Sequence, residues 1–142
     1  MKLLATLILL PALSWAHGED KPGPHDGHIQ MPGAFHTEIT VDKDQSVHVY
    51  LLDMNFANPT IKDSSVAVTA KNKKSEIKYT CSVMGNDHYH CIPNGKVPAK
   101  TDLIVQATRE KAVGNEAVYK LPLPAFKESK KESKKEDHSH HH

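Results

Sequence analysis

Two cysteines and two histidines lie close together in one short segment of the chain. The segment begins at Cys81, ends at Cys91 and contains His88 and His90. Residues 85–87 are Gly-Asn-Asp, which are typical turn residues. A three-residue loop there predicts a hairpin in which the two cysteines face each other, at a separation that a disulfide can close with little movement. We therefore expect a disulfide, which closes a short loop and stabilises the fold by about 2–3 kcal/mol.

The alternation of side chains along the same hairpin predicts a metal-binding face. His88 and His90 stand side by side on one strand, and Met84 lies opposite His88 on the other, all pointing away from the expected core. Imidazole nitrogen suits copper(II), zinc and nickel, and a Met thioether adds a preference for copper(I). We expect a metal ion here, with copper favoured over zinc or nickel. The alternative is an exposed strand face that carries ordinary solvated side chains.

The first sixteen residues have the features of an export signal. Lys2 precedes an apolar run over residues 3–13, which is too short to span a bilayer, and Ser14 and Ala16 are small residues at the positions that precede a cleavage site. We expect cleavage after Ala16 and a periplasmic or secreted protein, without a membrane span, in a compartment where cysteines pair. His17 would then be the N-terminus, and its amine and ring nitrogen can chelate one metal ion.

Two terminal segments carry further candidate donors. Residues 17–34 are rich in Gly and Pro, which predicts a flexible, irregular arm. Residues 127–142 repeat Glu-Ser-Lys-Lys without an apolar face, which predicts a disordered tail. The tail histidines would collect metal with low specificity, or they belong to an affinity tag. The candidate donors in the two segments are His17, His25, His28, Met31, His138, His140, His141 and His142.

Four polar residues of the expected domain have structural interpretations. His36 lies on the outward face of the first strand, where it is a candidate ligand or part of an ordinary polar face. His48 lies on a strand that is apolar on both faces, so we expect a buried, hydrogen-bonded side chain rather than a ligand. Asp53 and Asp63 adjoin loops and are expected to be turn or cap residues.

The apolar residues of 35–126 repeat with a period of two, which is typical of strands. Turn residues between these runs predict an all-β, antiparallel sandwich with immunoglobulin-like packing, with a small barrel as the alternative. The organisation is therefore an export signal over 1–16, the arm over 17–34, the sandwich over 35–126 and the tail over 127–142. The seven expected strands are residues 35–41, 46–54, 65–70, 76–83, 88–92, 101–108 and 116–123.

Composition narrows the range of functions. The 142 residues contain 18 Lys and Arg against 17 Asp and Glu, so the net charge of +1 argues against a nucleic-acid-binding protein. Two cysteines are too few for a zinc site made of cysteine alone, whereas eleven histidines favour metal chemistry. Gly-x-Ser-x-Gly, His-Glu-x-x-His and the phosphate-binding glycine loops do not occur, so we expect no enzymatic activity. A mononuclear copper oxidase that uses His17 is a distant alternative.

Two segments carry a family resemblance. Residues 23–38 read GPHDGHIQMPGAFHTE and residues 50–59 read YLLDMNFANP. With the export signal and the His-rich surface, the chain resembles the periplasmic copper-resistance proteins of the CopC-like and YtkA-like kind. This resemblance implies copper held by His17, a further His and a carboxylate, in a protein for copper storage, delivery or tolerance whose partner is another periplasmic copper-handling protein. The alternative is an interaction or structural module whose histidines are incidental.

Overall fold

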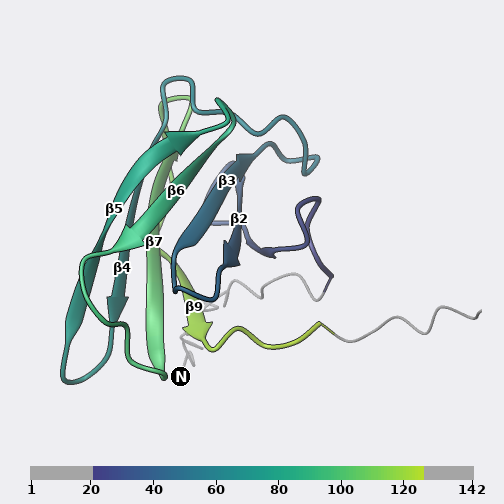
Figure 1. The fold of residues 1–142 in the computed structure, drawn as a ribbon. Coiled ribbons are helices and arrows are strands. Elements are labelled where there is room, and N and C mark those ends of the chain that lie inside the picture. The colour runs from purple at the N-terminus through teal and green to yellow at the C-terminus, as the bar shows by residue number, and fades with distance from the viewer. Residues whose placement is uncertain (1–20, 127–142) are drawn as a thin grey trace, which may run out of the picture.

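The computed structural model describes residues 21–126, and within that range the regular structure consists of strands alone. All seven expected strands are present, and β1 and the two-residue β8 are additional. Figure 1 shows β5 between β4 and β6. The strands are β1 (His28–Gln30), β2 (His36–Val41), β3 (Val47–Leu52), β4 (Ser65–Lys71), β5 (Glu76–Met84), β6 (His88–Pro93), β7 (Thr101–Arg109), β8 (Ala112–Val113) and β9 (Ala117–Leu121).

The strands pair antiparallel in the order β1-β2-β3-β6-β5-β4-β7, with β8 and β9 both on the remaining edge of β7. β5 belongs to both layers, because residues 76–78 pair with β4 and residues 79–84 pair with β6. The expected antiparallel sandwich is confirmed, with the layers joined through β5 in a shape close to a barrel. Two hydrogen bonds connect the layers on the side opposite β5. Gln30 Nε2 donates to the Val118 carbonyl at 2.5 Å, and Asn115 N donates to the Pro32 carbonyl at 2.8 Å.

The core lies between the two layers and is built by strict alternation. Along β7, for example, Leu103, Val105 and Ala107 are buried and the residues between them are only partly buried. β3 lies between β2 and β6, as its apolar character on both faces predicted. Each large aliphatic side chain buried in this way contributes about 1.5–3 kcal/mol. The face of β2, β3 and β6 that points away from the core can therefore hold polar side chains.

The described part of the N-terminal arm is more ordered than the flexible segment that was expected. β1 pairs with β2, and Glu38 on β2 is fully buried beneath the arm. The Glu38 carboxylate accepts the backbone N–H groups of His25 at 2.8 Å and Gly27 at 2.9 Å, and it accepts the Nδ1–H of His25 at 2.6 Å. Gly27 is required here because a Cβ would meet the carbonyl oxygen of Ile39. The outward face of β2 is thus covered rather than solvent-exposed.

The β5–β6 hairpin has the predicted register. Cys81 and Cys91 face each other across the ladder and form a disulfide. Met84 pairs with His88 across a three-residue turn over residues 85–87. Gly85 has φ +63°, the left-handed conformation that glycine adopts without steric penalty. The hairpin therefore holds His88 and His90 at fixed positions on the outer face of the sandwich.

Candidate metal centre

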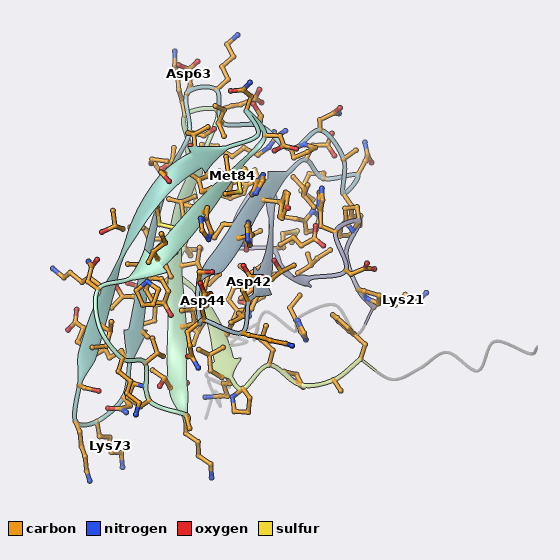
Figure 2. All side chains as sticks on the ribbon, in the orientation of Figure 1. Lys21, Asp42, Asp44, Asp63, Lys73 and Met84 are labelled. Carbon is orange, nitrogen blue, oxygen red and sulfur yellow. A yellow bond between two sulfur atoms is a disulfide. The ribbon has the colours of Figure 1, made fainter. Side chains whose placement is uncertain are left out.

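Asp42, His48 and His90 come together where the turn after β2 meets β3 and β6. The side chains of His48 and His90 share one face because the two residues are paired across β3 and β6. The turn places Asp42 beside them, since Asp42 N donates to the Ser46 carbonyl at 2.9 Å and reverses the chain. Each of the three offers a ligand atom within 4.8 Å of the other two. Figure 2 marks Asp42 and Asp44 near this turn.

Two carboxylates and two imidazoles lie in a continuous row of polar contacts through this site. His48 Nε2 donates to Asp42 Oδ2 at 2.9 Å, and His48 Nδ1 lies 3.1 Å from His88 Nε2. The other nitrogen of His88, Nδ1, donates to Asp87 Oδ1 at 2.6 Å. Both ring nitrogens of both histidines are therefore engaged, which holds the two rings in defined orientations.

The rings on this outer face form a row, which we call the ring row: His90, His48, His88, Tyr50 and His25. His48 stacks on His90 with ring centroids 4.6 Å apart, and its centroid lies 5.3 Å from that of His88. Tyr50 stacks between His88 at 4.4 Å and His25 at 3.7 Å. The stacking couples the metal-site histidines to the arm, which is anchored by the pairing of His25 with Glu38.

Carboxylates make the surroundings of the site favourable for a cation. Burial raises the pKa of Tyr50, and the nearby charges of Asp87, Glu38 and Asp42 raise it further. Hydrogen bonds from Ser46 lower the pKa of Asp44, and the neighbouring His90 ring adds to the effect. A site lined by several anionic groups attracts positive ions and stabilises them.

The site is open enough for an ion to enter. The side chain of Asp42 is 51% exposed and that of His48 is 19% exposed. Two imidazole nitrogens and a carboxylate oxygen are donors that suit copper(II), nickel and zinc. These three residues could therefore hold a divalent transition-metal ion.

The structure brings together only some of the predicted donors. His90 is one of the three converging donors, and His88 lies beside them with its Nε2 3.1 Å from His48 Nδ1. Met84 stands opposite His88 with 41% of its surface exposed. His25 lies at the far end of the ring row, where it donates to Glu38. Met31 is 49% exposed and follows β1, which pairs with β2 rather than with β3 or β6.

Two other predicted donors are occupied elsewhere. His28 Nε2 donates to the Pro124 carbonyl at 2.8 Å and its ring stacks on Phe126. His36 lies on the outward face of β2 as expected, but that face is covered and the residue is only 5% exposed. Its Nδ1 donates to the Asp53 carbonyl at 3.0 Å and its ring stacks on Phe56, which closes it off from the metal site.

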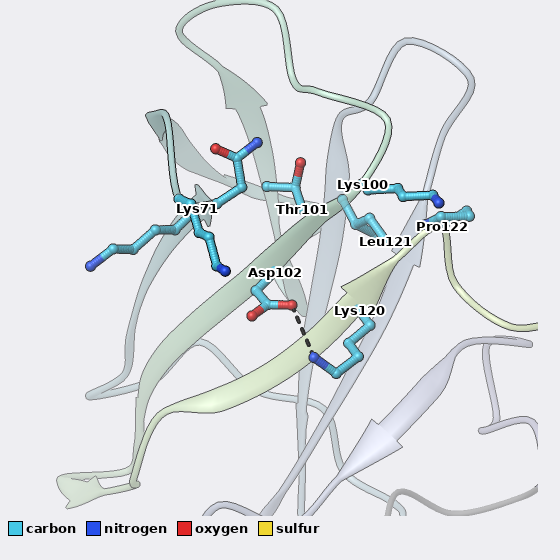
Figure 3. Close-up of a pocket in the computed structure, with 9 residues that line it drawn as sticks. Lys71, Lys100, Thr101, Asp102, Lys120, Leu121 and Pro122 are labelled. Carbon is cyan, nitrogen blue, oxygen red and sulfur yellow. Dashed lines mark hydrogen bonds and ion pairs between the residues drawn. The ribbon is translucent and has the colours of Figure 1, made fainter.

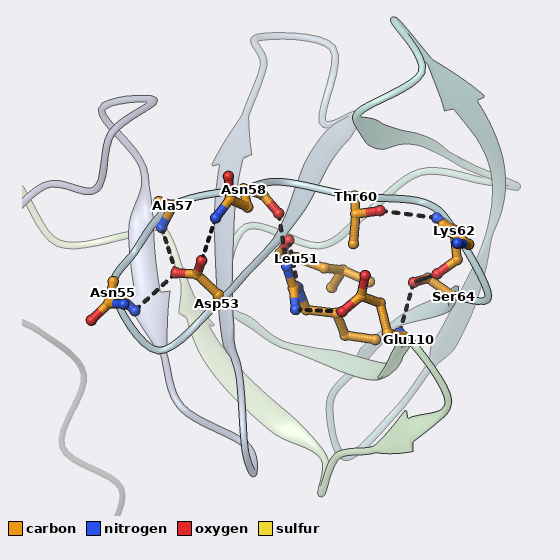
Figure 4. Close-up of polar contacts among 10 residues, drawn as sticks. Leu51, Asp53, Asn55, Ala57, Asn58, Thr60, Lys62, Ser64 and Glu110 are labelled. Carbon is orange, nitrogen blue, oxygen red and sulfur yellow. Dashed lines mark hydrogen bonds and ion pairs between the residues drawn. The ribbon is translucent and has the colours of Figure 1, made fainter.

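The loop that covers His36 is held by Asp53, which acts as a turn residue as expected (Figure 4). The Asp53 carboxylate accepts the backbone N–H of Asn55 and of Ala57 and the side-chain amide of Asn58. These bonds, led by that from Ala57, lower the pKa of Asp53. Arg109 donates to the carbonyl oxygen of Asn58 at 2.8 Å and joins the loop to β7. The loop is a structural element.

The remaining predicted donors lie outside the described residues. These are His17, on which the N-terminal chelate depends, and the four histidines of the tail, His138, His140, His141 and His142. The cleavage site after Ala16 lies outside as well.

Two members of the cluster were not predicted as ligands. Asp42 was not among the predicted donors, and His48 was expected to be a buried, hydrogen-bonded residue rather than a ligand. His48 is indeed hydrogen-bonded, but its pairing with His90 places it at the centre of the site. The sequence did indicate the outer face, since Thr40, His48 and Tyr50 alternate with core residues. The pairing of β3 with β6 could not be predicted from the sequence, because two other strands separate them along the chain.

A shallow pocket lies apart from the metal site, at the end of β4 and the start of β7 (Figure 3). It is lined by Lys71, Lys100 and Lys120, and Lys120 Nζ lies 3.3 Å from Asp102 Oδ1. These are surface lysines with one exposed ion pair, an arrangement that contributes little energy.

Comparison of the chain with protein-family models, curated proteins and solved structures finds no match. Within residues 21–126, no helix has the length and apolar character needed to cross a bilayer. The disulfide is typical of proteins that fold in an oxidising compartment. The function is therefore inferred from the geometry of the site.

Proposed function

We propose that this chain is an exported metal-binding protein that holds a copper ion at Asp42, His48 and His90, for storage, delivery or tolerance of the metal. The observation that carries this proposal is the convergence of three donor atoms within 4.8 Å on a disulfide-braced sheet face. A site on paired strands is held more rigidly than one on loops, which lowers the cost of organising ligands around an ion.

Copper is favoured among the divalent ions for chemical reasons. A site of nitrogen and oxygen donors generally binds copper(II) more tightly than nickel or zinc. The thioether of Met84, which pairs with His88 across the hairpin, is a soft donor of the kind that copper(I) prefers. The disulfide agrees with an exported protein, and the periplasm is the compartment that we propose.

The test uses the full chain with His138, His140, His141 and His142 replaced by serine, which we call the tail-silenced chain. Copper(II) affinity is measured by competition with a chelator. Replacing His48 and His90 together with Ala should weaken binding at least about a hundredfold, because loss of even an outer-shell partner weakens binding about 10–100-fold. His17 is also replaced with Ser in every variant, so an N-terminal chelate cannot mask the difference.

The matched control is His28→Ala, which removes a histidine outside the cluster and should leave copper affinity unchanged. Circular dichroism verifies that the double variant keeps its β-structure. If that folded double variant binds copper as tightly as its parent, the site is not a metal centre, and the interaction-module hypothesis becomes the better one.

A further inference from the structure

The hydrogen-bond pattern around His48 and His88 restricts where an ion can sit. His48 Nε2 faces the Asp42 carboxylate at 2.9 Å, and His88 Nδ1 faces the Asp87 carboxylate at 2.6 Å. An ionised carboxylate only accepts hydrogen bonds, so the nitrogens that face the two carboxylates carry the protons. In a neutral imidazole the other nitrogen then has a free lone pair.

The two free lone pairs face each other. They are on His48 Nδ1 and His88 Nε2, which lie 3.1 Å apart. Two neutral rings in these tautomers cannot form a hydrogen bond with each other, because neither facing nitrogen has a proton to donate. A cation between the two nitrogens resolves this conflict.

The separation of the two nitrogens suits two ligands of one metal ion. With metal–nitrogen bonds of about 2.0–2.1 Å, neighbouring ligand atoms in tetrahedral or square-planar geometry lie about 2.9–3.4 Å apart. The observed 3.1 Å lies inside this interval. The arrangement also has a carboxylate behind each imidazole, which is the usual outer shell of a metal-binding histidine.

We propose that a divalent metal ion binds between His48 Nδ1 and His88 Nε2, with Asp42 and Asp87 as positioning residues that fix the tautomers of the two rings. This inference rests on the proposed metal-binding function and deepens it. It makes His88 a direct ligand and places Asp42 behind His48. Tyr50, stacked on His88 at 4.4 Å, holds the plane of the second ligand ring.

The most direct test identifies the nitrogen that binds the metal in the unmutated rings. Zinc is diamagnetic, so long-range ¹H–¹⁵N correlation NMR of the tail-silenced chain can follow each histidine nitrogen as Zn(II) is added. We expect His48 Nδ1 and His88 Nε2 to move to the zinc-bound range while His48 Nε2 and His88 Nδ1 stay protonated. A zinc shift on His48 Nε2, with His88 unchanged, would overturn the proposal and place the ion beside Asp42.

Two variants separate ligands from positioning residues. His88→Gln should weaken Zn(II) binding at least about tenfold, since loss of a ligand has a larger effect than loss of its outer partner. Asp42→Asn should weaken binding yet leave the zinc shift on His48 Nδ1. His28→Gln is the matched control and should change neither affinity nor shifts. Unchanged affinity in folded His88→Gln contradicts the proposal.

The outcomes also distinguish this inference from the proposed function. If no ring nitrogen of His48, His88 or His90 shifts with zinc, and copper(II) binding is unaffected by replacing His48 and His90, both proposals fail. If binding depends on His48 and His90 but not on His88, the metal-binding function stands and only the ion position inferred here is wrong.

Discussion

The carboxylate of Glu38 shows how one buried charge organises the outer face of the sheet. It is fully buried, yet it accepts two backbone N–H groups and pairs with His25. A buried carboxylate is tolerated only when hydrogen bonds of this kind replace its hydration. The same contacts hold the arm, whose His25 stacks on Tyr50 at one end of the ring row.

Replacing Glu38 with Gln should destabilise the fold by about 1.5–3 kcal/mol, the usual strength of hydrogen bonds to a charged group. The amide retains the size of the side chain but removes the charge that the two N–H groups and His25 stabilise. Urea unfolding measures the difference. Glu116→Gln, at an exposed position, is the control and should leave the midpoint unchanged. Equal midpoints for the two variants would show that the carboxylate does not secure the arm.

The two faces of the β5–β6 hairpin have different roles, one structural and one chemical. Cys91 and Tyr89 point into the core, whereas His88 and His90 lie on the outer face. Successive side chains of a strand alternate between faces, so one short segment supplies both a covalent brace and metal donors. The brace limits how far β6 and its two histidines can move relative to β5.

Removing the disulfide with Cys81→Ala and Cys91→Ala together should lower the free energy of unfolding by about 2–3 kcal/mol, because the unfolded chain is no longer constrained by the loop that the bond closes over a sequence separation of 10. Chemical denaturation of the double variant and of its parent measures this loss. Reduction of the unmutated chain with a thiol is the companion experiment, since it breaks the bond without removing atoms from the core. A midpoint that neither treatment moves would contradict the prediction.

The two layers of the whole molecule are also connected by a buried polar contact opposite β5. Tyr119 on β9 donates to the Thr37 carbonyl at 3.0 Å and lies 2.7 Å from the Thr37 hydroxyl. Burial raises the pKa of Tyr119 far above its ordinary value, and these hydrogen bonds offset only part of the rise. The neutral phenol is therefore part of what keeps β9 against β2.

Stability should consequently fall as the pH rises above about 10. Tyr119 ionises in the unfolded chain but stays neutral in the folded one, so the unfolded state binds fewer protons and is favoured by about 1.4 kcal/mol per pH unit. Tyr119→Phe should cost about 1 kcal/mol near neutral pH through the lost hydrogen bond. The difference in free energy of unfolding between this variant and the parent should disappear at pH ~11. Urea unfolding of both proteins across this range measures the two slopes, and parallel slopes would contradict the assignment.

Much of this architecture could be predicted from alternation and turn chemistry. The seven strands, the central position of β3 and the disulfide register all follow from a period of two and from local turn residues. These are short-range properties, because the face of each side chain depends only on its position along its own strand. His88 and His90 were identified as donors for the same reason.

The partners of those donors were decided by tertiary structure. His48 meets His90 only because β3 pairs with β6, and Asp42 joins them because the turn after β2 reverses beside that pair. His36 and Glu38 alternate like exposed residues, yet the Phe56 loop and the arm cover them. Strand pairing and loop packing are set by the total burial of the fold, which no local pattern encodes. The sequence thus determined the strands and one face of donors, and the tertiary structure decided which of those donors share a site.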